Sequence, residues 1–304
     1  MNIQEHNQLR SEQTALRRML AGIPPENVLD RSGLEARLEE VDERLASGGA
    51  PGRGPARAVL TFGGRPVLDR RGIFADFGSQ AANRFTDAVA KVVAGLAAPL
   101  AAMGPVPNRA ESQLLITSTA VGSFGFEFEE YRPSVLDFGE ESPTGQALQI
   151  VQGLLEGTRG TDDDLADSAA AADPRAVAAV REFLELLAAS EAVCALEFNE
   201  RSSRFRDVGE VRRAVARLSR ENLREERKTL RGEFLGVLPE ARRFEFKLST
   251  EGEVIRGKIG PAVGDPDAIN RHLHQPTEIA VMATQVGSGK PRYVLQSVPA
   301  WEGK

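Results

Sequence analysis

The chain has 304 residues and a formal net charge of −6, with 41% hydrophobic and 27% charged residues. These values are ordinary for a globular protein and leave room for about two domains. The single cysteine, Cys194, excludes a disulfide framework, and no apolar run approaches the roughly 18 residues that cross a bilayer. We therefore expect a soluble protein of the reducing cytoplasm.

The charges are unevenly divided along the chain. Residues 1–199 carry a net charge of −11, whereas residues 200–304 carry +5. A basic C-terminal third can approach a polyanion even when the whole chain is acidic. The alternative is that these charges form an ordinary solvated face.

Residues 1–47 are predicted to form a helical hairpin. Apolar residues recur at helical spacing on both sides of Pro24-Pro25, which separates the two helices: Leu9, Leu16, Leu20 and Ile23 in the first, and Leu34, Leu38, Val41 and Leu45 in the second. The 4-3-4 spacing of the second set is typical of a short coiled coil. This seam packs either on its own chain or on a second copy, and the second alternative predicts a homo-oligomer.

A glycine- and proline-rich linker over residues 48–55 leads to a predicted central α+β domain over residues 56–199. Residues 56–68 are expected to form a β-hairpin around Gly63-Gly64. The apolar face of a helix over residues 77–96 is then expected to pack on that hairpin.

The stretch from Leu114 to Tyr131 alternates with period two and predicts a second hairpin. Phe124, Phe126 and Phe128 fall on one face, and the intervening glutamates fall on the other. We interpret the phenylalanines as core, the alternative being an aromatic binding surface. The sequence around Ser123 does not fit a hydrolase nucleophile turn, because no helix follows it.

The type II′ turn expected at Gly122-Ser123 sets the register of this hairpin. Counting outward from the turn pairs Thr119 with Phe126 and Thr117 with Phe128.

The remainder of the central domain contains two further predicted helices, over residues 144–155 and 175–189, and a strand over residues 193–198. Between the helices, residues 157–173 are interpreted as a polar, acidic, solvated loop. Hairpins together with segregated helices favour an α+β architecture over a doubly wound sheet.

Residues 200–304 are predicted to form a lead-in helix, over residues 208–218, and a small five-stranded β-barrel. The expected elements are strands over residues 228–238, 242–248 and 253–259, a helix over 265–272, and strands over 278–284 and 292–298. Three strands, a helix and two strands is the OB-like element order. A barrel of the SH3 type and an open sheet are the alternatives.

No motif in the chain reaches the specificity of a catalytic, cofactor or metal site. Residues 287–290, GSGK, lack the first glycine, the hydroxyl residue and the helix of a phosphate-binding loop, so we expect a hairpin turn. The acidic residues 162–167 lack the pattern of a calcium-binding loop. His272 and His274 do not share a helical face as metal ligands would. We assign no catalytic residue, no cofactor and no metal.

The basic third is the strongest pointer to a function. We expect a non-enzymatic assembly or adaptor protein whose barrel binds a protein or polyanionic partner. The candidate partner-binding residues are Arg212, Arg213, Arg217, Arg231, Arg243, Lys247, Arg256 and Lys258.

Two alternatives stay open. The first is a nucleic-acid-binding protein that uses the same basic residues, with Phe244, Phe246 and Tyr293 as candidates for base stacking. Their spacing also fits a barrel core, which is the interpretation we favour. The second alternative is an enzyme with an unrecognised carboxylate-based site.

Overall fold

The computed structural model describes residues 9, 12–13, 15–17, 19–20, 28–47, 55–69, 71–120, 124–131, 141–250, 252–299 and 301. The chain divides into two compact units, which we describe separately. One comprises residues 1–57 and 132–142, and the other comprises residues 58–131 and 143–304.

The first unit contains the predicted helical hairpin. Helix α2 (Val28–Ser47) packs against the helical residues that precede it, and the shared seam consists of buried Leu9, Leu16 and Val41 with half-buried Leu34 and Leu38. Arg37 pairs with Glu12 at 2.8 Å, and Arg31 donates a hydrogen bond to the carbonyl of Leu20. These contacts join the start of one helix to the end of the other, so the helices are antiparallel. Residues 48–54 of the linker lie outside the described residues.

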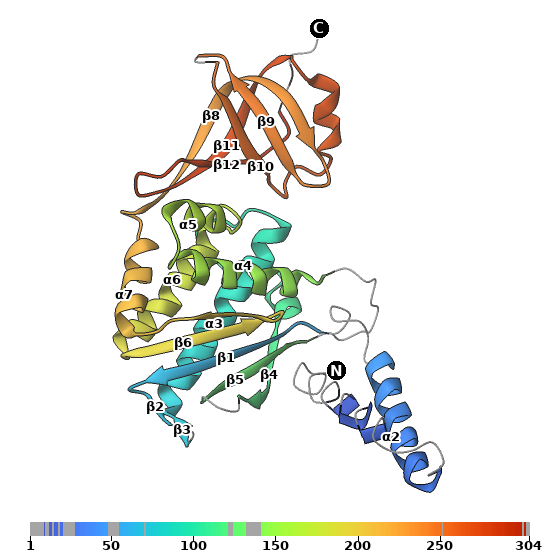
Figure 1. Ribbon diagram of the computed structural model, residues 1–304. Coiled ribbons are helices and arrows are strands. Elements are labelled where there is room, and N and C mark those ends of the chain that lie inside the picture. The colour runs from blue at the N-terminus through green and yellow to red at the C-terminus, as the bar shows by residue number, and fades with distance from the viewer. Residues whose placement is uncertain are drawn as a thin grey trace. The chain divides into compact units, whose positions relative to one another are not determined.

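The second unit begins with a five-stranded sheet in the order β4-β5-β1-β6-β7 (Figure 1). Its strands are β1 (Arg57–Gly64), β4 (Leu114–Thr119), β5 (Phe124–Glu130), β6 (Ala192–Phe198) and β7 (Arg201–Arg204). The short 3-10 helix η1 (Arg109–Ser112) precedes β4. The hairpin that we predicted over residues 56–68 is wrong. Strand β1 pairs with distant β6, while β2 (Val67–Leu68) pairs with β3 (Gly72–Ile73).

Helices α3 (Ala75–Ala97), α4 (Pro143–Gly157) and α6 (Pro174–Ala189) cover one face of this sheet (Figure 1). The core between the layers is centred on Phe85, whose ring lies 5.2 Å from that of Phe128 on β5 and 6.0 Å from that of Phe183 on α6. Helix α7 (Val208–Arg217) packs beside α6, and Asp207 caps it by accepting a hydrogen bond from the amide of Glu210.

The predicted acidic loop over residues 157–173 is wrong, because it contains helix α5 (Asp162–Ala169). Thr161 and Asp164 form a reciprocal capping box at its start. This arrangement satisfies amides that a helix end would otherwise leave unpaired. Three aspartates in the first turn also interact favourably with the positive end of the helix dipole.

The phenylalanine stretch is core on the side that we predicted, but to different depths. Phe128 is fully buried, whereas Phe124 and Phe126 are half-buried. Thr119 faces Phe126 as predicted, but a bulge between Ile116 and Ser118 places Ile116, not Thr117, opposite Phe128. The predicted turn at residues 122–123 lies outside the described residues.

The C-terminal strands form a closed, mixed barrel, and this confirms the predicted five-stranded fold. Its elements are β8 (Leu223–Leu238), β9 (Arg243–Leu248), β10 (Val254–Ile259), the 3-10 helix η2 (Asp267–His272), β11 (Pro276–Val286) and β12 (Arg292–Leu295). Strand β8 pairs with β11 along its first part and with β9 along its last part. Parallel pairing of β10 with β12 closes the circle.

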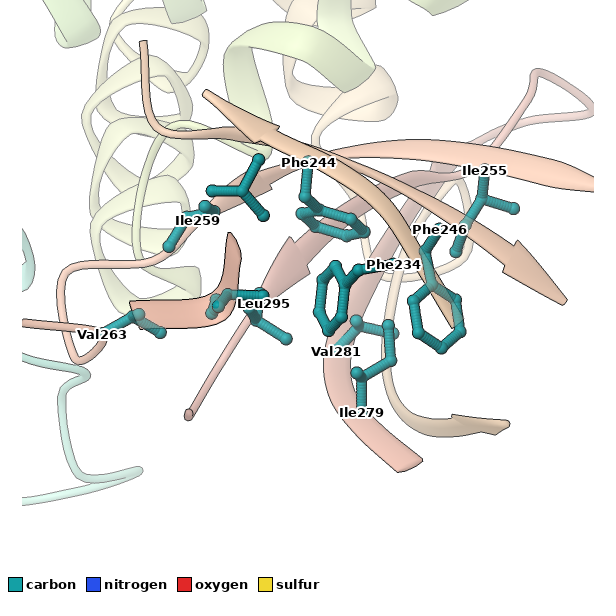
Figure 2. Packing of buried hydrophobic residues seen from close by; sticks show 11 residues of the cluster. Phe234, Phe244, Phe246, Ile255, Ile259, Val263, Ile279, Val281 and Leu295 are labelled. Carbon is teal, nitrogen blue, oxygen red and sulfur yellow. The ribbon is translucent and has the colours of Figure 1, made fainter. Parts of the chain in front are cut away.

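Aliphatic side chains and three phenylalanines fill the barrel (Figure 2). The Phe234 ring lies 5.9 Å from that of Phe244 and 5.0 Å from that of Phe246, and all three side chains are buried. Phe244 and Phe246 therefore belong to the core and cannot stack on bases. Tyr293 is half-buried against the same cluster.

Candidate partner-binding face of the barrel

The outward side of strands β9 and β10 gathers four of the eight residues that we predicted to bind a partner. Along each strand the side chains alternate between the core and the solvent. Burial of Phe244, Phe246, Ile255 and Ile259 therefore directs the intervening residues outward. These are Arg243, Glu245 and Lys247 on β9, and Val254, Arg256 and Lys258 on β10. We call these six residues the outward face.

Two cations of the outward face are neutralised by neighbouring strands. Arg256 lies opposite Glu245 in the β9–β10 register and pairs with it at 2.7 Å. Lys247 lies opposite Glu233 on β8, and their charged atoms are 3.8 Å apart. Because these pairs are largely exposed, each contributes at most about 1 kcal/mol to stability.

The other two cations oppose each other. Arg243 and Lys258 are direct cross-strand partners, and neither forms an ion pair with any residue that the structure describes. Partial burial lowers the pKa of Lys258, and the nearby Arg243 charge lowers it further, while Asp167 acts in the opposite direction. Like charges directly across two strands destabilise a sheet. An anion placed between Arg243 and Lys258 would relieve that repulsion.

Exposed apolar side chains lie on and beside the outward face. Leu238 on β8 lies opposite Arg243 and is 63% exposed, and Val254 on β10 is 43% exposed. Leu238 thus adjoins the cation pair, whereas Val254 lies at the other end of β10, opposite Lys247. Such a mixture suits a protein segment better than a bare chain of phosphates.

The other four predicted residues lie elsewhere. Arg231 pairs with Glu278 on β11. Arg217 donates hydrogen bonds to the carbonyls of Gly157, Thr158 and Gly160 and pairs with Asp162, so it holds the start of α5. Arg212 and Arg213 are exposed on α7, apart from β9 and β10 in Figure 1. The predicted set is therefore not one continuous surface.

The hairpin between β11 and β12 is held by the chain itself. Arg292 pairs with Asp163 at 3.2 Å and with Asp167 at 2.5 Å, both on α5. At Gly287, where φ is +53°, a Cβ would stand 2.8 Å from an oxygen of Asp162. Residues 287–290 thus form the expected hairpin turn, but the acidic run beside them makes ion pairs and is not a solvated linker. OB-like barrels bind ligands through the second and third strands and the loops beside them. In this chain the outward face consists of the second and third barrel strands and remains exposed, whereas the loop between β11 and β12 is held by α5.

Glu225 on β8 is a residue that sequence reasoning missed. Burial raises its pKa to about 7, and the nearby charge of Asp173 contributes to the rise. Asp173 itself caps α6 and accepts a hydrogen bond from the amide of Leu100. A buried carboxyl with such a pKa can act as a general base. However, both carboxylate oxygens of Asp173 accept hydrogen bonds from backbone amides and so have structural roles. We therefore interpret Glu225 as part of the packing between the barrel and the helices.

Metal-ligating side chains do not cluster in the described part of the chain, where no group of three His, Cys, Asp or Glu residues could hold an ion. His272 stacks on Trp301, with ring centroids 4.1 Å apart. Within the same residues, no helix is long and apolar enough to span a membrane.

The comparisons with known proteins add no relative. No protein-family model matches the sequence, and neither the curated proteins nor the solved structures contain a significant match. The function must therefore be inferred from the geometry of the chain.

Proposed function

We propose that this chain is a non-enzymatic assembly or adaptor protein that binds an acidic segment of a partner protein on the outward face of its barrel. The observation that carries the proposal is the opposition of Arg243 and Lys258, neither of which forms an ion pair within the described residues, although the charge of Asp167 acts on Lys258. Two of the four cations on this face pair with Glu245 and Glu233, so the positive charge that favours an anion belongs to Arg243 and Lys258. Two exposed apolar residues beside them favour a polypeptide.

A protein partner is better supported than a nucleic acid. Single-stranded nucleic acids need exposed aromatic side chains for stacking. Phe244 and Phe246 are buried, and the predicted arginines are divided between α7, β8 and the outward face. These two observations weaken the nucleic-acid alternative, which becomes an outcome of the test below.

The cytoplasm remains the compartment that we propose. Cys194 is buried, and burial raises the pKa of its thiol to about 12. A thiol of this kind is held as a core side chain and is inert as a nucleophile. A chain with one such cysteine gains nothing from an oxidising environment.

Binding of a short labelled peptide of alternating glutamate and serine tests the proposal. Fluorescence anisotropy would be measured with the full chain at about 50 mM salt, where charge contacts are strongest. Arg243→Glu and Lys258→Glu should each weaken binding by about tenfold or more, which corresponds to about 1.4 kcal/mol. Arg271→Glu in η2 is the matched control, because it makes the same charge change on an exposed residue outside the face.

Three outcomes would count against the proposal. If Arg271→Glu weakens binding as much as Arg243→Glu, then overall charge and not the outward face determines affinity. If a mixed-sequence single-stranded oligonucleotide binds more tightly than the peptide and responds to the same variants, the nucleic-acid alternative replaces the protein partner. If neither probe binds, the barrel is not a polyanion-binding module.

A further inference from the structure

The central sheet ends in an edge strand, β4, that has a bulge between Ile116 and Ser118 but no charged side chain to protect it. Within the described residues, β4 pairs with β5 on one side and with no strand on the other. Every side chain of β4 is exposed or half-exposed, and Leu115 and Ile116 are 44% and 54% exposed. No charged residue occurs from Gln113 to Thr119. An uncharged apolar edge is a template for another strand.

The opposite edge of the same sheet is built differently. Strand β7 has the sequence RSSR, and it begins and ends with Arg201 and Arg204. Both are exposed, and the guanidinium of Arg201 also pairs with Glu156. Charged residues on an edge strand disfavour pairing with further strands. One edge of the sheet is therefore blocked while the other is open.

We infer that β4 pairs antiparallel with β4 of a second copy of this chain. Self-pairing meets no charge repulsion because the strand is neutral, whereas an acidic or basic partner would find no complementary charge on it. The charged β7 edge cannot continue the sheet, so association through β4 stops at a symmetric pair. The result is a continuous ten-stranded sheet, made from the two five-stranded sheets. This inference is independent of the barrel.

The side chains of β4 fit this symmetry. A two-fold axis perpendicular to the sheet keeps the helix-covered face of both copies on the same side. Ile116 lies opposite Phe128, on the helix-covered face but exposed, while Leu115 lies opposite Glu129 on the other face. Each face of the joined strands thus receives at least one apolar side chain from each copy. Pairing of one strand buries less area than a standard stable interface, so the dimer is weak and depends on concentration.

Sedimentation velocity of the full chain over a range of concentrations tests the inference. We expect a monomer–dimer equilibrium whose dissociation constant rises by about tenfold or more in Ile116→Lys and in Leu115→Lys. Met103→Lys, at a loop residue that is 83% exposed, is the control and should leave the equilibrium unchanged. Hydrogen exchange of the β4 amides in the wild type should slow as the protein concentration rises. This readout does not depend on the lysine substitutions, so a loss of folding caused by a lysine cannot explain it.

Several results would overturn the inference. A wild-type monomer at the highest soluble concentration would do so, and so would a dimer that both lysine variants leave intact. Higher oligomers would contradict closure at the charged β7 edge. Leu115 and Ile116 point to opposite faces, so if one variant fails to fold, the other still tests dimerisation. Hydrogen exchange of the wild-type β4 amides tests it without any variant.

Discussion

The barrel and the central sheet are both five-stranded, but they differ in what happens at their edges. Every strand of the barrel has a neighbouring strand on both sides, so the closed barrel has no edge strand, and we expect its side chains to make the contacts with a partner. The central sheet keeps two edges, one blocked by arginines and one neutral. We therefore propose two kinds of recognition, by charge on the barrel and by backbone pairing on the sheet.

This difference predicts different responses to salt. Binding at the outward face depends on Arg243 and Lys258 and should weaken as salt screens their charges. Pairing of β4 involves no charged side chain and should change little. The predictions below test first the cores that hold the two regions and then the surfaces themselves.

The largest expected effect is in the core of the central domain. Phe128→Ala removes a fully buried ring that contacts Phe85, and we expect a loss of about 3 to 5 kcal/mol of unfolding free energy. Phe126→Ala should cost less, because Phe126 is half-buried. Chemical denaturation of both variants measures the difference. Equal losses would mean that the two rings are buried alike.

The barrel should be sensitive to a single added methyl group at Gly257. A Cβ there would lie 2.5 Å from the Phe244 ring and 2.6 Å from the carbonyl oxygen of Tyr293. Gly257→Ala is expected to cost about 1 to 3 kcal/mol through overpacking. Gly236→Ala, where a Cβ meets nothing within 4 Å, is the control. If the two variants unfold at the same denaturant concentration, the barrel is more loosely packed than described.

Glu225 makes stability depend on pH. The pKa of Glu225 is about 7 in the folded chain and lies above its ordinary value of 4.5, so as pH rises the unfolded chain releases this proton first. Stability should therefore fall as pH rises from about 4.5 to about 7 and then level off. Glu225→Gln should remove this dependence and gain on the order of 1–2 kcal/mol above pH 7. An unchanged pH profile in the variant would show that Glu225 is solvated.

The helical hairpin should affect the oligomeric state least. Leu38 packs on buried Leu9, Leu16 and Val41, so the apolar seam of the hairpin is covered by residues of the same chain. Leu38→Asp is expected to reduce helix content by circular dichroism and to leave dimerisation through β4 unchanged. A shift to monomer in this variant, with Ile116→Lys still dimeric, would instead support the coiled-coil association that the seam spacing suggests.

Local patterns predicted the elements better than their pairing. Alternation and turn residues were enough for the order of strands in the barrel. In contrast, pairing of β1 with β6 joins residues about 130 positions apart, and no local signal indicates it. The sequence did contain the signal for α5, because Thr161 and Asp164 have the spacing of a capping box. The high density of acidic residues led us to interpret that segment as solvated.

The candidate site was predictable in composition but not in arrangement. Arg243 and Lys258 were both among the predicted residues, yet only the β9–β10 register places them opposite each other. The pairing of Arg231 and Arg256 with glutamates also depends on register. Burial of Glu225 arises from packing of the barrel near Asp173, which the sequence around either residue does not indicate.

The most direct test of the central claim is a reversal of charge preference at the outward face. Affinities of the wild type and of the double variant Arg243→Glu/Lys258→Glu would be measured for an acidic peptide and for its lysine-containing counterpart at equal length. We predict that the wild type prefers the acidic peptide and that the double variant prefers the basic one. A double variant that retains the wild-type preference for the acidic peptide would contradict the account.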